Sequence, residues 1–269
     1  MSRLLIKPDY NSADGRRIHI TPESAGWKYV GFDYYVLDKD QSITGQTNER
    51  EVCIVLMSGA ISVRTGGNQW DEIIGRKSVF DKVPPTAIYI PNNSDYFVTA
   101  LDGAELGICS APGLGNFGAR LITPDMLNVI PRGKGTNTRY ICDIMMGNME
   151  ADSLLVVEVK TPGGHWSSYP SHKHDQDNVP NESYLEETYF HKLNPDQGFA
   201  VQRVYNDDST LDETMTVKNN CAVLVPEGYH PVGVPYGYNS YYLNVMAGPK
   251  RQWIFHNDPN HEWIFDRDK

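Results

Sequence analysis

The sequence predicts an all-β protein built from two tandem barrels. Short apolar runs end at turn residues, as at 52–57 before Gly59, 87–90 before Pro91 and 154–159 before Pro162. Such runs, rich in Val, Ile, Tyr and Phe, are typical of β-sandwiches and barrels rather than of βαβ units. Helical patterning is sparse, and residues 124–130 have room for about one turn before Pro131.

A polar, glycine-rich segment at 131–137 lies near the midpoint of the chain. Segments of this kind connect structured regions, so we expect a boundary here. The sequence therefore predicts an N-terminal barrel over 1–131 and a C-terminal barrel over 132–269.

The two halves share landmarks at similar spacing. A glutamate precedes an apolar run, a proline follows about 40 positions later, and an acid or a histidine stands four residues beyond it. The landmarks are Glu51, Pro91 and Asp95 in the first half and Glu187, Pro226 and His230 in the second. This repetition indicates duplicated barrels, the first of which is degenerate because it lacks a histidine cluster.

Composition excludes several classes of protein. The 269 residues are 22% charged and 40% hydrophobic, which is ordinary for a globular protein. A net charge of −10 without a basic run argues against nucleic acid and anionic membranes as partners. No apolar run approaches the ~18 residues of a membrane span, and residues 1–7 are too polar for a signal peptide. The four cysteines lie singly in apolar stretches, as buried thiols do in a reducing cytoplasm, where we expect this protein.

Histidines are concentrated in the second half, which holds seven of the eight. His172 and His174 form a His-x-His pair, and on an extended segment both side chains point to the same side. Glu187 opens the next apolar run and could add a carboxylate, and His230 follows a turn that could aim its ring back. Three imidazoles and one carboxylate suit Zn²⁺, Fe²⁺, Mn²⁺, Co²⁺ or Ni²⁺ and leave positions open for substrate.

Other polar residues near this cluster receive structural interpretations. By strand alternation Lys173 should face away from the metal. We expect His165 in a turn, His191 facing outward from a strand, and His256 and His261 in structural or interface positions.

Three segments of the second half resemble the two motifs of the cupin family: SHKH, LEETYF and VPEGYH. The resemblance implies a bicupin whose second barrel binds metal through His172, His174, Glu187 and His230. The gap of 13 positions between His174 and Glu187 is longer than in the generic motif. It leaves Glu182 and Glu186 as competing ligands.

The whole chain resembles, more specifically, the 5-deoxy-glucuronate isomerase family of inositol catabolism. The matching segments are 26–35, 132–144, 167–175, 182–205, 225–232 and 256–264. The resemblance implies a cytoplasmic enzyme, an intramolecular oxidoreductase that converts 5-deoxy-glucuronate to 5-dehydro-2-deoxy-D-gluconate.

Such a reaction moves a proton between adjacent carbons through an enediolate, so it needs a general base and a Lewis acid. Glu187 and Glu182 are candidate bases. Tyr242 is our candidate proton relay, with Tyr189, Tyr229 and Tyr241 as alternatives.

The substrate is a carboxylate, so an acidic protein must supply a local cation to bind it, and arginine suits a carboxylate best. Arg203 and Arg139 lie on predicted strands and are the candidate substrate-binding residues. Arg251 is a weaker alternative.

Three other functions compete with this one. They are the related uronate ketol-isomerase of pectin breakdown, a metal-dependent cupin dioxygenase or epimerase, and a non-catalytic sugar-binding cupin. The complete ligand set of the second half disfavours the last. We expect a homo-oligomer that associates through exposed sheet edges.

Overall fold

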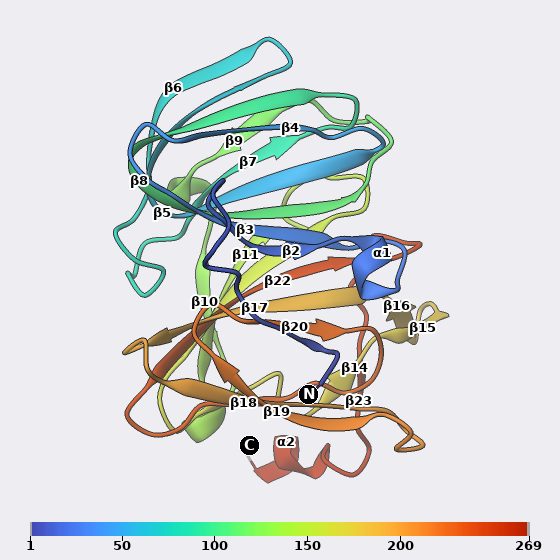
Figure 1. Ribbon diagram of the computed structural model, residues 1–269. Coiled ribbons are helices and arrows are strands. Elements are labelled where there is room, and N and C mark those ends of the chain that lie inside the picture. The colour runs from blue at the N-terminus through green and yellow to red at the C-terminus, as the bar shows by residue number, and fades with distance from the viewer. Residues whose placement is uncertain (1, 268–269) are drawn as a thin grey trace. The chain divides into compact units, whose positions relative to one another are not determined.

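The computed structural model describes residues 2–267, and almost all of its regular structure is β-strand (Figure 1). Strands make up 52% and helices 6%, which confirms the predicted all-β class. Among the described residues, no helix combines the length and the apolar character needed to cross a membrane.

Contacts divide the chain into two units. The N-terminal unit comprises Pro8–Asn128 and Cys142–Val157, and the C-terminal unit comprises Met1–Lys7, Val129–Ile141 and Glu158–Lys269. Residues 1–7 group with the C-terminal unit because Leu5 pairs with Val223 in its sheet. The division into 1–131 and 132–269 stays a prediction about domains, and the contact units exchange short segments across it.

The N-terminal unit contains one antiparallel sheet of eight strands in the order β2-β3-β8-β5-β7-β9, with β4 beside β8 and β6 beside β5. Its elements are β2 (Arg16–Ile20), α1 (Pro22–Ala25), β3 (Gly31–Leu37), β4 (Ser42–Gln46), β5 (Arg50–Thr65), β6 (Asn68–Ile74), β7 (Thr86–Ile90), β8 (Asp95–Pro112), β9 (Arg120–Ile122) and the 3-10 turn η1 (Pro124–Met126). The turn η1 is the single turn expected near residue 124. Ile54, Leu56, Ile88 and Val98 are completely buried in the core of this unit. Burying each such side chain stabilises the fold by about 1.5–3 kcal/mol.

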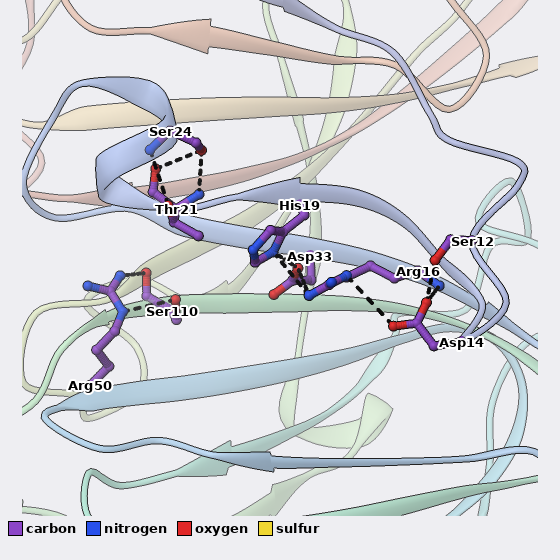
Figure 2. Close-up of polar contacts among 9 residues, drawn as sticks. All are labelled: Ser12, Asp14, Arg16, His19, Thr21, Ser24, Asp33, Arg50 and Ser110. Carbon is purple, nitrogen blue, oxygen red and sulfur yellow. Dashed lines mark hydrogen bonds and ion pairs between the residues drawn. The ribbon is translucent and has the colours of Figure 1, made fainter.

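Local polar contacts define the start of this sheet (Figure 2). Ser24 N donates to Thr21 Oγ1 at 3.2 Å and Thr21 N donates to Ser24 Oγ at 2.9 Å, which caps α1 reciprocally. Gly26 ends this helix with a φ of 75°, a conformation that glycine adopts without strain. His19 and Asp33 pair across β2 and β3, with 2.6 Å between Nδ1 and Oδ1.

The C-terminal unit contains a seven-stranded sheet, a four-stranded sheet and two strand pairs. The sheets have the orders β1-β20-β17-β22-β12-β11-β10 and β13-β21-β18-β19, and the pairs are β14-β23 and β15-β16. Its elements are β1 (Leu5–Ile6), β10 (Val129–Arg132), the 3-10 turn η2 (Gly135–Asn137), β11 (Arg139–Met145), β12 (Leu155–Thr161), β13 (Trp166–Ser167), β14 (His172–Lys173), β15 (Asp175–Asn178), β16 (Glu182–Tyr184), β17 (Glu186–Asn194), β18 (Phe199–Tyr205), β19 (Asp212–Lys218), β20 (Ala222–Val225), β21 (Val232–Gly233), β22 (Asn239–Ala247), β23 (His256–Asn257) and α2 (Trp263–Arg267). Strands β11 and β12 extend beyond the residues of this unit.

Candidate metal centre and adjoining cavity

Three strands of the C-terminal unit bring the predicted metal ligands together. His172 begins β14 and His174 follows it directly, while Glu187 lies at the start of β17. Glu187 pairs with Val225, the last residue of β20, and the turn that follows this strand carries His230. The spacing of the motifs thus places ligands from distant parts of the sequence at one end of the neighbouring strands β17 and β20 (Figure 1).

The four side chains face one another at distances that suit a metal ion. One ring nitrogen from each of His172, His174 and His230 lies within 4.8 Å of the others. Glu187 Oε2 lies 3.1 Å from His174 Nε2 and 3.2 Å from His230 Nε2. This is a compact set of three imidazoles and one carboxylate, the donor set expected from the sequence.

The outer nitrogens of two of these rings are already held by the backbone. Nδ1 of His174 lies 3.1 Å from the carbonyl oxygen of Leu185, and Nδ1 of His230 lies 2.8 Å from that of Gly228. A proton on each Nδ1 satisfies these carbonyls and leaves Nε2 as the electron-pair donor. Nε2 of His230 is buried without a hydrogen bond of acceptable geometry. A divalent ion at this point would satisfy it, so the residues fit a metal.

Electrostatics favour the protonation states that metal ligands need at Glu187 and His172. At His174 burial acts to lower the pKa, but the contact with Glu187 outweighs burial and raises it. Burial acts to raise the pKa of Glu187, but the close contacts with the imidazoles of His174 and His230 outweigh burial and lower the pKa to about 2. Burial lowers the pKa of His172 well below its usual value, and the two neighbouring imidazoles act in the same direction. A charged carboxylate and a neutral imidazole are the forms that coordinate a metal.

The competing carboxylate Glu182 lies in a separate network. Its Oε1 accepts hydrogen bonds from the backbone N–H groups of Asp175 and Gln176, at 2.7 and 3.2 Å. Lys173 lies 3.5 Å from the same oxygen and 2.7 Å from Asp175 Oδ1. Lys173 also pairs with Asp207 at 3.2 Å, and its side chain is only 3% exposed. The structure therefore places Glu187, and not Glu182, beside the histidines.

Two buried tyrosines, Tyr189 and Tyr242, pack beside the histidine cluster. The rings of Tyr189 and Tyr242 lie 4.8 Å apart, and that of Tyr189 lies 5.6 Å from His230. Tyr189 Oη is 2.9 Å from the hydroxyl of Ser168. Burial raises the pKa of Tyr242, although Ser167 and Ser168 act against it. The phenol of Tyr242 is therefore protonated at neutral pH.

A cavity of about 540 Å³ adjoins His172 within the C-terminal unit. Arg132, Lys134 and Arg139 contribute positive charge to its lining, and Trp253 and Phe255 contribute aromatic rings. Arg139 is half-buried and Nη1 donates to the carbonyl oxygen of Asn137 at 3.1 Å, which fixes its position. The cavity thus joins a member of the histidine cluster to cations that can hold an anion.

The second predicted substrate-binding arginine lies elsewhere. Arg203 Nε and Nη2 each donate to the carboxylate of Asp212 at 2.7 Å, and its guanidinium lies 3.9 Å from the ring centroid of Tyr205. Arg203 is not among the residues that line the cavity beside His172. Strand alternation made Arg203 and Arg139 equally good candidates for binding the substrate. Their partners in the structure distinguish them, because the charge of Arg203 is paired with Asp212.

The outward orientation expected for His191 is wrong. Its side chain is completely buried, and Nε2 lies 2.9 Å from Gln202 Oε1. The ring stacks against Tyr189 at 6.0 Å. Strand β17 has buried side chains on both faces from Glu186 to His191, so alternation does not identify a solvent side.

The remaining histidines lie outside the cluster. Nδ1 of His165 is 2.8 Å from the carbonyl oxygen of Thr138. His256 lies exposed on β23. Nε2 of His261 lies 3.8 Å from Asp258 Oδ2.

Sequence reasoning missed four residues of the cavity, Arg132, Lys134, Trp253 and Phe255. The two cations belong to the segment interpreted as a boundary, because its glycines suggested a linker. Three cations lie within eight residues here, ending at Arg139, but residues 76–82 also hold three, so the density of cations alone does not mark a site. The aromatic pair gave no signal either, since nothing local relates residue 253 to His172.

Comparison with known proteins identifies a family. Residues 4–264 match the model of the KduI/IolB family. The chain is 54% identical over 266 residues to the 5-deoxy-glucuronate isomerase of Geobacillus kaustophilus, covering 99% of this chain and 96% of that protein. It is 46% identical over 271 residues to the 5-deoxy-glucuronate isomerase of Bacillus subtilis strain 168, covering 99% and 100%.

Solved structures give the same result. The crystal structure of an IolB-like protein from Salmonella typhimurium LT2 matches with a TM-score of 0.95 and 48% identity, covering 98% of this chain and 100% of that one. Lactobacillus farciminis oxalate decarboxylase matches with a TM-score of 0.65 and 13% identity, covering 96% and 89%. The second likeness concerns the fold alone and supports the two-barrel cupin architecture.

Proposed function

This chain belongs to the KduI/IolB family, and we propose that it is an isomerase that converts 5-deoxy-glucuronate to 5-dehydro-2-deoxy-D-gluconate. The resemblance inferred from the sequence is confirmed by the family match and by the relatives. The observation that best supports this reaction is the position of His172. This residue belongs to the histidine cluster and also lines the cavity that contains Arg139.

The histidine cluster would hold a divalent ion, which we propose to be Zn²⁺, Mn²⁺, Fe²⁺, Co²⁺ or Ni²⁺. When bound by His172, His174, His230 and Glu187, the ion would act as a Lewis acid toward the oxyanion of the enediolate. Glu187 keeps its carboxylate charged there, and Asn244 donates a hydrogen bond to its Oε1. This bond orients the carboxylate for ligation or for proton transfer.

The remaining roles fall to residues of the cavity and of the tyrosine cluster. Arg139 would bind the substrate carboxylate, since a guanidinium forms strong charge-assisted hydrogen bonds with it. Tyr242 holds a proton on its phenol and would donate it, while Glu187 is the proposed base. Both groups are buried, so water is excluded from the proton transfer.

Two further proposals concern the setting of the enzyme. We place it in the cytoplasm, because its four cysteines are free and buried. Association into a homo-oligomer stays a prediction.

An isomerisation assay tests this function. Metal-loaded protein is incubated with 5-deoxy-glucuronate in D₂O without oxygen, and the sugar is followed by NMR. We expect the ketose to form, and we expect no conversion by His174→Ala, which removes one ligand. Tyr236→Ser is the matched control, because this ring is 92% exposed and lies outside the cavity.

Failure of folded, metal-loaded protein to convert the sugar would overturn the assigned substrate. Conversion by the His174→Ala variant at the normal rate would instead overturn the role of the metal. A requirement for oxygen would favour the dioxygenase alternative.

A further inference from the structure

Two aromatic side chains, Trp253 and Phe255, lie beside the histidine cluster. We call this pair the aromatic wall. The Phe255 ring lies 4.9 Å from that of His172, the Trp253 ring lies 6.0 Å from it, and the two wall rings are 4.8 Å apart. Both residues line the cavity. Any molecule that reaches the metal from this cavity therefore passes the wall.

The backbone holds the wall in place. Ile254, which separates its two residues, donates its N–H to Ser183 Oγ at 3.0 Å and accepts from Ser183 N at 2.9 Å. Just beyond the wall, β23 pairs with β14, so that Asn257 faces His172. The backbone of the wall is thus anchored to β16 between its two residues and to the strand of His172 just beyond them.

The wall also reaches the cationic end of the cavity. The guanidinium carbon of Arg132 lies 5.5 Å from the ring centroid of Trp253. Trp253 therefore contacts both His172 and a cation. A sugar acid with its carbonyl end at the histidine cluster and its carboxylate at the cations would lay the carbons next to that carboxylate along these rings.

We propose that the aromatic wall contacts the C5 methylene of the substrate and makes the site selective for 5-deoxy sugar acids over their 5-hydroxy counterparts. This inference rests on the proposed function. C5 adjoins the carboxylate, so it lies beside the cationic end, where Trp253 meets Arg132. A methylene gains by leaving water for an aromatic face.

A hydroxyl at C5 would be treated differently. Pressed against the faces of Trp253 and Phe255 it loses its hydrogen bonds to water, and the ring faces do not replace them. A hydrophobic surface rejects an added hydroxyl by no more than roughly 100-fold, because the group can partly adjust. We therefore expect a preference of about 10- to 100-fold for the deoxy compound.

The test compares kcat/KM for 5-deoxy-glucuronate and for glucuronate, which differ by one hydroxyl. The variants are Phe255→Asn and Trp253→Gln, which offer a partner to that hydroxyl, with Tyr236→Ser as a control. Phe255→Tyr is a milder version in case the others fold poorly. We expect the wall variants to lower the preference by about tenfold, and the control to keep the wild-type ratio. Metal content is measured in each protein, because general damage lowers both kcat/KM values together and leaves their ratio unchanged.

Outcomes separate the wall from the proposed function. If wild type converts 5-deoxy-glucuronate but its kcat/KM values for the two sugars are nearly equal, the selectivity assigned to the aromatic wall is wrong. The proposed isomerase function is unaffected by that result. A wild-type preference that persists in every folded, metal-loaded wall variant also overturns the selectivity assigned to the wall. Absence of turnover of either sugar overturns the proposed function, and the selectivity falls with it.

Discussion

Acid should destabilise this protein through one buried imidazole. His191 on β17 is completely buried, and its Nε2 meets only an amide oxygen, that of Gln202. Burial lowers its pKa from 6.5 to about 4, although the hydrogen bond with Gln202 acts in the opposite direction. The side chain is therefore neutral in the folded protein over a pH range in which the unfolded chain is already protonated.

The sign and the size of the effect follow from this difference. Between pH 6.5 and pH 4 the unfolded state binds a proton that the folded state does not bind, so the free energy of unfolding falls as the pH falls. Each unit of pKa difference corresponds to about 1.4 kcal/mol, so the full loss is about 3 kcal/mol. Above pH 6.5 both states are neutral at this position, and the stabilisation is fully present.

Urea denaturation of wild type and His191→Gln, at about pH 7 and about pH 4.5, measures this effect. Glutamine keeps an amide N–H for Gln202 but does not titrate. Both proteins are measured with a chelator present. The histidines of the cluster then make the same contribution to the pH dependence of stability in both proteins, and this contribution cancels in the comparison. We expect wild type to lose about 2–3 kcal/mol more than the variant on acidification. Equal losses in the two proteins would refute the reasoning, because His191 would then be charged or hydrated in the fold.

Three further substitutions test the site and the two units. Arg139→Met should raise KM for the sugar acid about 10- to 100-fold, with a smaller effect on kcat, because the variant loses a charge-assisted hydrogen bond to the substrate. Steady-state kinetics measure both constants, and an unchanged KM would contradict this role. Lys173→Met should lower the free energy of unfolding by about 3 kcal/mol, because buried carboxylates lose their partner. It should also weaken metal binding in calorimetric titration, with Lys173→Arg recovering part of the loss; full metal affinity in the methionine variant would argue against a positioning role. Glu51→Gln should lower the free energy of unfolding by about 3 kcal/mol, because it removes a buried carboxylate that accepts several backbone hydrogen bonds. Urea denaturation measures this loss, and metal binding should not change. A variant as stable as wild type would refute the prediction.

The assembly of the histidine cluster could be predicted because each of its motifs is local, and its binding of a metal stays a prediction. In His172-Lys173-His174 the period of an extended segment is enough to bring two imidazoles to one side, and their rings indeed lie 6.2 Å apart. The same alternation turns Lys173 toward Asp175. Glu187 opens an apolar strand, and that strand's neighbour ends where the turn to His230 begins. Each motif depends on residues within a few positions of one another, whereas the pairing of β17 with β20 joins Glu187 to Val225, far along the chain.

Side-chain partners across the sheet could not be predicted in the same way. Arg203 and Arg139 both lie on alternating strands, but Arg203 is neutralised by Asp212, which is opposite Tyr205 in β19. His191 looked exposed because polar residues usually are, yet Gln202 on another strand provides its hydrogen bond. Both outcomes depend on which residues the register brings opposite one another, and a single sequence does not specify that register.

The internal repeat shows the same limit at the scale of a barrel. Glu51 and Glu187 both lie at the second residue of a strand whose antiparallel neighbour ends just before a proline, as the landmarks predicted. Their carboxylates nevertheless meet different partners. Glu187 faces two imidazoles, whereas Glu51 accepts hydrogen bonds from the backbone N–H groups of residues 152–154 and from Tyr89 Oη, at 2.6 to 2.8 Å.

The donors to Glu51 show how a carboxylate at this position is compensated by groups other than histidines. A buried carboxylate must be compensated, and backbone N–H groups can do so as a cation does. Because Glu51 takes three of its donors from residues more than 100 positions along the chain, no local motif announces them. The carboxylate of Glu51 thus anchors a backbone segment of the N-terminal unit, while that of Glu187 faces the histidine cluster. A repeat in sequence thus predicts where a strand places a side chain, and the distant chain that packs there decides what the side chain does.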